Sequence, residues 1–190
     1  MNNVGGSLQE MVNSSILVLT QPSVPTFERF ERRGNLQKAL IYIAVAAIIA
    51  GIFGLFGGPR RFIGQLIAVI VNFLVFTYAT YYIGQRQGGT GTLDEVAYTF
   101  SLFVAPLQVI GSILGTVLLL LAFIPIINVL AAIIGLIVAI AILVFEIRLG
   151  HMAVESSMNI TDSGRAWRVL IMAAVATFIV SFLISAVFRI

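Results

Sequence analysis

Long runs without a single charged residue dominate the pattern of hydrophobic and polar positions along this chain. They cover 39–59, 62–85, 96–145 and 169–188. A helix needs about 20 apolar residues to cross the roughly 30 Å hydrocarbon core of a bilayer, because each residue adds about 1.5 Å. Three of the runs match one crossing each. None alternates with period two, so the pattern predicts transmembrane helices rather than a barrel.

The run 96–145 is too long for one crossing. Its 50 residues would form a helix of about 75 Å, more than twice the core thickness, so the chain must fold back. Pro125 lacks an N–H and disfavours helix at Ile124, and proline suits the first turn of a following helix. The sequence therefore predicts five spans, over about 39–58, 62–84, 96–121, 125–147 and 168–188.

Basic residues are distributed unevenly between the two sides that five spans define. One side holds eight of them and the other three, and the richer side is expected to be cytoplasmic. The eight are Arg29, Arg32, Arg33, Lys38, Arg86, Arg148, Arg165 and Arg168, and the three are Arg60, Arg61 and Arg189. We therefore expect a cytoplasmic N-terminal arm over 1–38, an all-α transmembrane domain over 39–190, and a C-terminus on the outside.

The arm carries the pattern of a short amphipathic helix. Ser7 and Glu10 have the spacing of a capping box, and apolar residues follow at helical spacing as far as Leu19. Pro22 and Pro25 then end the helix. At about 13 residues it is too short to span a bilayer and is expected to lie in the interface. Two roles stay open: simple packing on the bundle, or sensing of a lipid surface or partner.

Composition supports a membrane protein and removes several other classes. Of the 190 residues, 59% are hydrophobic and 10% charged, whereas soluble domains have about 25% charged residues. The net charge of +3 is small and scattered, so no nucleic-acid surface is expected. The chain has no cysteine, which excludes disulfides and thiolate chemistry.

A glycine-rich loop precedes the third predicted span. It contains Gly89 and Gly91 and resembles a phosphate-binding turn, but no Lys-Ser/Thr pair follows it. A flexible loop is therefore the preferred interpretation. Asp94 and Glu95 come directly after it, where carboxylates favour the positive end of a helix dipole.

The third span contains an internal proline and two glycines. Pro106 removes one backbone hydrogen bond, and Gly111 and Gly115 lie on one face because they are four residues apart. Such a pair lets a neighbouring helix approach closely. We therefore expect a kinked helix that packs tightly, with the fourth span as its neighbour. A hinge or a binding pocket is the alternative.

Polar residues within the spans do not form a recognisable catalytic group. Asn72 and Gln108 are not ionisable, and we interpret Glu146 as an interfacial ion pair with Arg148. His151 is the only histidine. The sequence therefore predicts no catalytic residues, no metal site, no cofactor and no enzyme activity.

Several short motifs are spread along the chain. They are Leu19-Thr20-Gln21-Pro22 with Phe27, the stretch from Gly89 to Glu95 that leads to Tyr98, Ala105-Pro106-Leu107, and Ile124-Pro125. Together they resemble the motifs of the Yip family, the Ypt-interacting-protein group of five-span membrane proteins, and especially its prokaryotic branch. The resemblance implies five helices, a cytoplasmic N-terminus and membership in complexes. Eukaryotic members engage Rab-type GTPases, but their larger N-terminal region is missing here, which argues against Rab binding.

These patterns lead to two expected functions. The first is a non-enzymatic scaffold or organiser in the plasma membrane of a prokaryote, which acts by self-association or through a membrane-protein partner. The alternative is a transporter of a small solute or a lipid, built around the third span and the glycine-rich loop. Besides the bilayer itself, the expected partners are a second copy of the chain or another membrane protein.

Overall fold

The structure is a computed structural model that describes residues 4–188. Its elements are α1 (Val4–Thr20), α2 (Val24–Glu28), α3 (Leu36–Gly54), the short 3₁₀ helix η1 (Leu55–Gly57), α4 (Pro59–Arg86), α5 (Leu93–Leu121), α6 (Asn128–Ser157) and α7 (Ser163–Phe188). The helices α3 to α7 are the five that are long and apolar enough to cross a membrane. The predicted all-α, five-span fold is thus confirmed.

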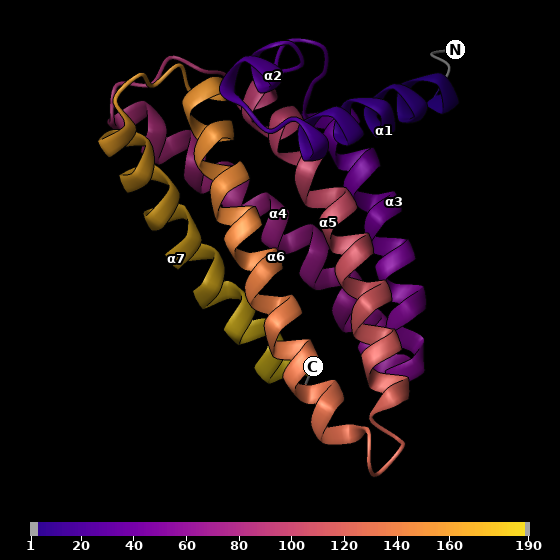
Figure 1. The fold of residues 1–190 in the computed structure, drawn as a ribbon. Helices are drawn as coiled ribbons and strands as arrows, with labels where there is room; N and C mark the ends of the chain where they lie inside the picture. Colours follow the sequence, from indigo (N-terminus) through magenta and orange to yellow (C-terminus); the bar gives the residue numbers. More distant parts are fainter. Residues whose placement is uncertain (1–3, 189–190) are drawn as a thin grey trace.

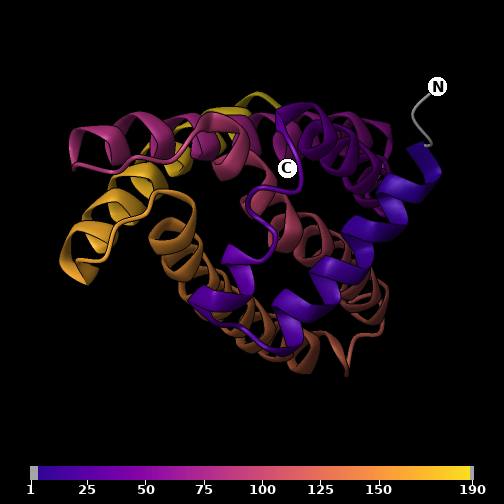
Figure 2. The same cartoon turned by 90° about the horizontal axis from the view of Figure 1, so that it is seen from above.

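The two N-terminal helices lie at one end of the bundle, which we call the arm end. The turn between α5 and α6 lies at the opposite end, which we call the far end (Figure 1). Figure 2 looks down on the arm end and shows α1 running across it toward α2, which contacts α6. In the bundle, α3 packs against α4 and α5, α4 against α7, and α5 against α6.

Small side chains bring α3 close to its neighbours. Its buried face includes Ala39, Ala46, Ala47, Ala50 and Gly51. In a bilayer the lipid tails are as apolar as a helix surface, so close van der Waals packing of small residues is what holds helices together. This face lets α3 pack closely against α4 and α5 along one side of the bundle (Figure 1).

The far half of α6 makes few contacts within the chain. Between Asn128 and Arg148, Ala131 is the only buried residue. Most of the exposed side chains are isoleucine, leucine and valine, which a bilayer can cover. This half of α6 is therefore a lipid-facing surface of the single chain.

The turn at the far end differs from the prediction at Pro125. Pro125 lies inside the turn and α6 begins at Asn128, so Pro125 is not in the first turn of that helix. The N–H groups of Ile127 and Asn128 both donate to the carbonyl of Ile124, at 2.9 Å each. The chain therefore completes a separate turn before the helix begins. At its other end α6 continues to Ser157, ten residues beyond the predicted limit at 147, because charged residues end an apolar run without ending a helix.

The helix α1 also differs from the prediction. It begins at Val4, so Ser7 lies within the helix and the predicted capping box at Ser7 and Glu10 is wrong. The predicted apolar stripe divides into two parts. Met11 and Val18 are buried against the bundle, whereas Val12 and Ile16 are 44% and 54% exposed. The helix therefore packs on the bundle and still presents an apolar flank.

Candidate functional site

The arm is attached to the arm end of the bundle by a buried aromatic side chain. Phe27, on α2, is fully buried and meets the ring of Phe103 on α5 edge to face, with centroids 6.2 Å apart. The N–H of Thr26 donates to the Ser23 hydroxyl at 3.3 Å, which caps α2. Because α2 has only five residues, tertiary packing rather than helix propensity must hold it in place. Phe27 supplies that packing.

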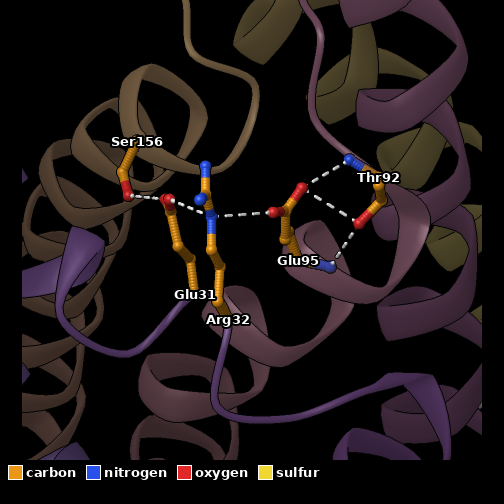
Figure 3. Close-up of polar contacts among 5 residues, drawn as sticks. All are labelled: Glu31, Arg32, Thr92, Glu95 and Ser156. Carbon is orange, nitrogen blue, oxygen red and sulfur yellow. Dashed lines mark hydrogen bonds and ion pairs between the residues drawn. The ribbon is translucent and has the colours of Figure 1, made fainter.

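Polar contacts next to Phe27 join the arm to both α5 and α6 (Figure 3). The Ser156 hydroxyl donates to the Glu31 carboxylate at 2.7 Å. Arg32 lies between two carboxylates, with its Nε atom 3.7 Å from Glu31 and 3.3 Å from Glu95. Burial raises the pKa of the Glu31 carboxyl above its usual value, and the Ser156 hydrogen bond opposes this rise. We call Glu31, Arg32, Thr92, Glu95 and Ser156 the arm-end cluster.

Glu95 also begins α5. The Thr92 N–H donates to Glu95 Oε2 at 2.7 Å, and the Glu95 N–H donates to the Thr92 hydroxyl at 3.2 Å. These two bonds form a capping box. Asp94 makes a different contact, because its carboxylate accepts from the N–H of Leu36 at 2.8 Å and so joins the start of α3 to the start of α5. Both carboxylates thus lie at a helix start, as predicted, and each also links segments that are distant in sequence.

The glycine-rich loop is held against the end of α6. The Thr90 N–H donates to the Met158 carbonyl at 3.0 Å. A Cβ atom on Gly91 would collide with the Ser157 carbonyl, and one on Gly89 would press against Met158. The loop is therefore a packed connection rather than the free loop that we expected. Its glycines are explained by close approach to α6, without a phosphate.

The other arm-end residues named from the sequence lie close by. Tyr98 is 1% exposed, and its ring covers Gly34, where an added Cβ would collide with it. Pro22 is partly buried in the turn between α1 and α2. The structure thus gathers Pro22, Phe27, Gly89, Gly91, Glu95 and Tyr98 at the arm end, away from Pro125 at the far end.

A cavity of about 350 Å³ lies between α4, α5, α6 and α7. Asn72, Gln108 and Glu146 line it together with Thr177 and Ser181. Within residues 4–188, Glu146 makes no ion pair, so the predicted pair with Arg148 is wrong. Residues two apart on a helix do not face each other, and the i, i+2 spacing could have shown this. Sequence reasoning therefore missed Glu146 as a cavity residue.

A second cavity, of about 370 Å³, lies between α3, α4 and α5 toward the far end. Gly111 and Gly115 line it, and a Cβ atom added to either would meet nothing within 4 Å. The predicted close approach of a neighbouring helix to these glycines is therefore wrong. The helix α5 runs without interruption through Pro106. Gln108, half a turn beyond, lines both cavities.

His151 belongs to an aromatic and polar group on α6 and α7. Its ring stacks on Trp167 with centroids 4.4 Å apart, and its Nε2 atom lies 3.1 Å from the Ser163 hydroxyl and 3.6 Å from Glu155. In the described part of the chain, no three residues of the His, Cys, Asp and Glu types gather where they could hold a metal ion. These contacts join α6 to the start of α7.

Comparisons with protein-family models, with curated proteins and with solved structures found no match to this chain. The fold therefore defines the class of protein by itself. It is an all-α, multi-pass membrane protein with five transmembrane helices and a short N-terminal helix packed across one end of them.

Proposed function

We propose that this protein is a non-enzymatic membrane scaffold of the Yip type in the plasma membrane of a prokaryote. It acts by self-association or through a membrane-protein partner, with the arm end in the cytoplasm. The observation that carries this proposal is the fixed arm: Phe27 and the arm-end cluster attach it to α5 and α6, while Val12 and Ile16 stay exposed.

The exposed flank of α1 gives the arm a surface for interaction. An apolar flank on a helix at the end of a transmembrane bundle can enter the interfacial region of a bilayer or contact another membrane protein. A helix that is rigidly attached presents this flank in one orientation, and this lowers the entropy cost of binding. Such a fixed surface suits an organiser of other components better than it suits a catalyst.

Cysteine cross-linking tests the proposal directly, because the chain has no cysteine of its own. Ile16→Cys places a single thiol on the exposed flank of α1, and Ile179→Cys places one on an exposed position of α7 as a matched control. We expect Ile16→Cys to form cross-linked dimers or a cross-link to a partner in native membranes, well above the control. Equal yields for the two variants would contradict a role for the arm in association.

The variant Phe27→Ala completes this test. Removing a fully buried phenylalanine costs about 3–5 kcal/mol in a packed core, so α2 should loosen from α5 and α6 and the orientation of the arm should become less fixed. The Ile16→Cys cross-link should then weaken, while the matched change Phe123→Ala, at a 75% exposed position in the far-end turn, should leave it unchanged. A cross-link that survives this loosening would show that the fixed orientation is not needed.

Transport of a small solute or a lipid is the second candidate, and one observation favours it. Gln108 lines both the far-end cavity and the cavity next to Glu146. Two cavities that share one polar residue near mid-bilayer could connect if α5 bent at Pro106. The test is the flux of a labelled solute into proteoliposomes that contain the wild type or Gln108→Trp. Flux that is present with the wild type and lost with Gln108→Trp would support transport, and equal flux with the two proteins would argue against this route.

A further inference from the structure

The cavity between α4, α5, α6 and α7 carries acceptor groups and no basic residue. Glu146 is the one charged side chain in its lining, and Asn72 and Gln108 add amide groups. The Asn72 Oδ1 atom is buried and has no hydrogen-bond partner among the described residues. A buried acceptor without a donor is unfavourable, so a ligand that brings donors into this cavity would be stabilised.

Four aromatic rings contribute to the apolar part of the lining. They belong to Phe73, Phe76, Phe103 and Phe178. The faces of aromatic rings carry negative potential and attract cations, most strongly where water is excluded. A carboxylate, amide oxygens and aromatic rings in the lining therefore favour a positively charged group over an anion.

The cavity also reaches the lipid-facing surface of the bundle. Its lining residues Leu143 and Phe178 are 54% and 73% exposed. A molecule with an apolar chain can therefore enter from the bilayer and keep that chain among apolar side chains. The volume of about 350 Å³ falls within the range of about 300–1,000 Å³ found for small-molecule sites.

We infer that this cavity binds the ammonium group of an amphiphilic amine. The Glu146 carboxylate faces the ammonium group, the Asn72 and Gln108 amides accept its hydrogen bonds, and the phenylalanine rings cover its apolar part. An acidic residue inside a transmembrane helix needs a partner or a polar cavity, and the ligand would provide the partner. The inference goes beyond the scaffold proposal and requires neither self-association nor transport.

Two sources offer the same chemistry. One is the headgroup of an amine lipid such as phosphatidylethanolamine, and the other is a free alkylamine that partitions into the membrane. Both present an ammonium group next to an apolar chain, so both would use Glu146 in the same way.

Equilibrium binding of octylammonium to the full chain in a neutral maltoside detergent tests the site, with octanol as the uncharged match and protein-free micelles as the blank. We expect the wild type to prefer octylammonium over octanol by about tenfold or more, and Glu146→Gln to lose the preference. Glu28→Gln, an exposed carboxylate on α2, should keep it. Ala174→Phe, which fills the cavity without changing a charge, should weaken binding of both probes.

Two outcomes would overturn the inference: equal affinity of the wild type for octylammonium and octanol, or an unchanged preference in a folded Glu146→Gln variant. If Glu146→Gln does not fold, octylammonium binding is measured with Ala174→Phe and Asn72→Ala instead. Affinity equal to the wild type in both variants would overturn the inference. Nanodiscs separate the two sources. Displacement of octylammonium by phosphatidylethanolamine, but not by phosphatidylglycerol, assigns the lipid headgroup, and no displacement by either assigns the free amine.

Discussion

The guanidinium group of Arg32 lies 3.3 Å from one carboxylate oxygen of Glu95, whose other oxygen caps the first turn of α5. The Glu95 side chain thus caps the first turn of a transmembrane helix and also forms an ion pair with the arm. The Arg32 side chain is 74% exposed, and exposed ion pairs contribute only about 0–1 kcal/mol. The attachment of the arm therefore depends mainly on its buried contacts. These are Phe27 and the bond between Ser156 and Glu31 near α2, and Met11 and Val18 on α1.

Glu31 should make the stability of the arm depend on pH. Burial raises the pKa of its carboxyl in the folded state, so the folded chain binds a proton more readily than the unfolded chain. Stability from this group is therefore highest below its unfolded pKa and falls as pH rises through the folded pKa. Glu31→Gln, which keeps the shape and can still bond Ser156, should melt higher than the wild type at neutral pH.

The comparison needs two pH values. Thermal melting of the wild type and of Glu31→Gln in detergent should differ at pH 7 and converge in acid, where the wild-type carboxyl is also neutral. Glu10→Gln is the control, because Glu10 is an exposed carboxylate on α1. A Glu31→Gln variant that melts lower than the wild type at pH 7 would mean that the charge of Glu31 stabilises the arm.

Gly91→Ala should destabilise the protein. The new Cβ would collide with the Ser157 carbonyl, which is backbone and cannot turn aside, so we expect a loss of about 1–3 kcal/mol. Gly111→Ala is the matched control, because nothing lies within 4 Å of its new Cβ. Denaturation in mixed micelles should show a clear loss for the first variant and little change for the second. Equal stability of the two would mean that the loop does not rest on α6.

Gly115→Leu should be tolerated by the single chain. Gly115 opens into the far-end cavity, where a larger side chain has room. The free energy of unfolding should therefore stay within about 0.5 kcal/mol of the wild type, as for other sites without close contacts. A large loss of stability would reveal a neighbour that fills this cavity in the membrane, such as a second copy of the chain.

The spans could be predicted from the sequence because the length of each uncharged run can be compared directly with the thickness of a bilayer's hydrocarbon core. Helix starts were harder to predict. Ser7 and Glu10 match a capping pattern, but the helix begins earlier, whereas Thr92 and Glu95 form a capping box because the loop before them is fixed on α6. The spacing of residues along the chain does not reveal which of two capping-box patterns forms a real cap, because tertiary contacts decide where each helix begins.

The site residues divide in the same way. Motif resemblance led to Phe27, Gly91 and Glu95, which the structure gathers at the arm end. Glu146 was misassigned because its nearest opposite charge in sequence, Arg148, is on another face of the helix. The cavity that Glu146 lines is formed by four helices, and the packing of four helices cannot be derived from the spacing along one of them.

The central claim is that the chain has five spans with its arm end in the cytoplasm. Labelling of single cysteines in intact cells with a membrane-impermeant thiol reagent tests this claim most directly. Ile126→Cys reports on the far end, where Ile126 is 91% exposed, and Thr161→Cys reports on the exposed loop between α6 and α7 at the arm end. We predict that Ile126→Cys is labelled in intact cells and that Thr161→Cys is labelled only after the membrane is permeabilised. Labelling of Thr161→Cys in intact cells, with Ile126→Cys protected, would contradict the account.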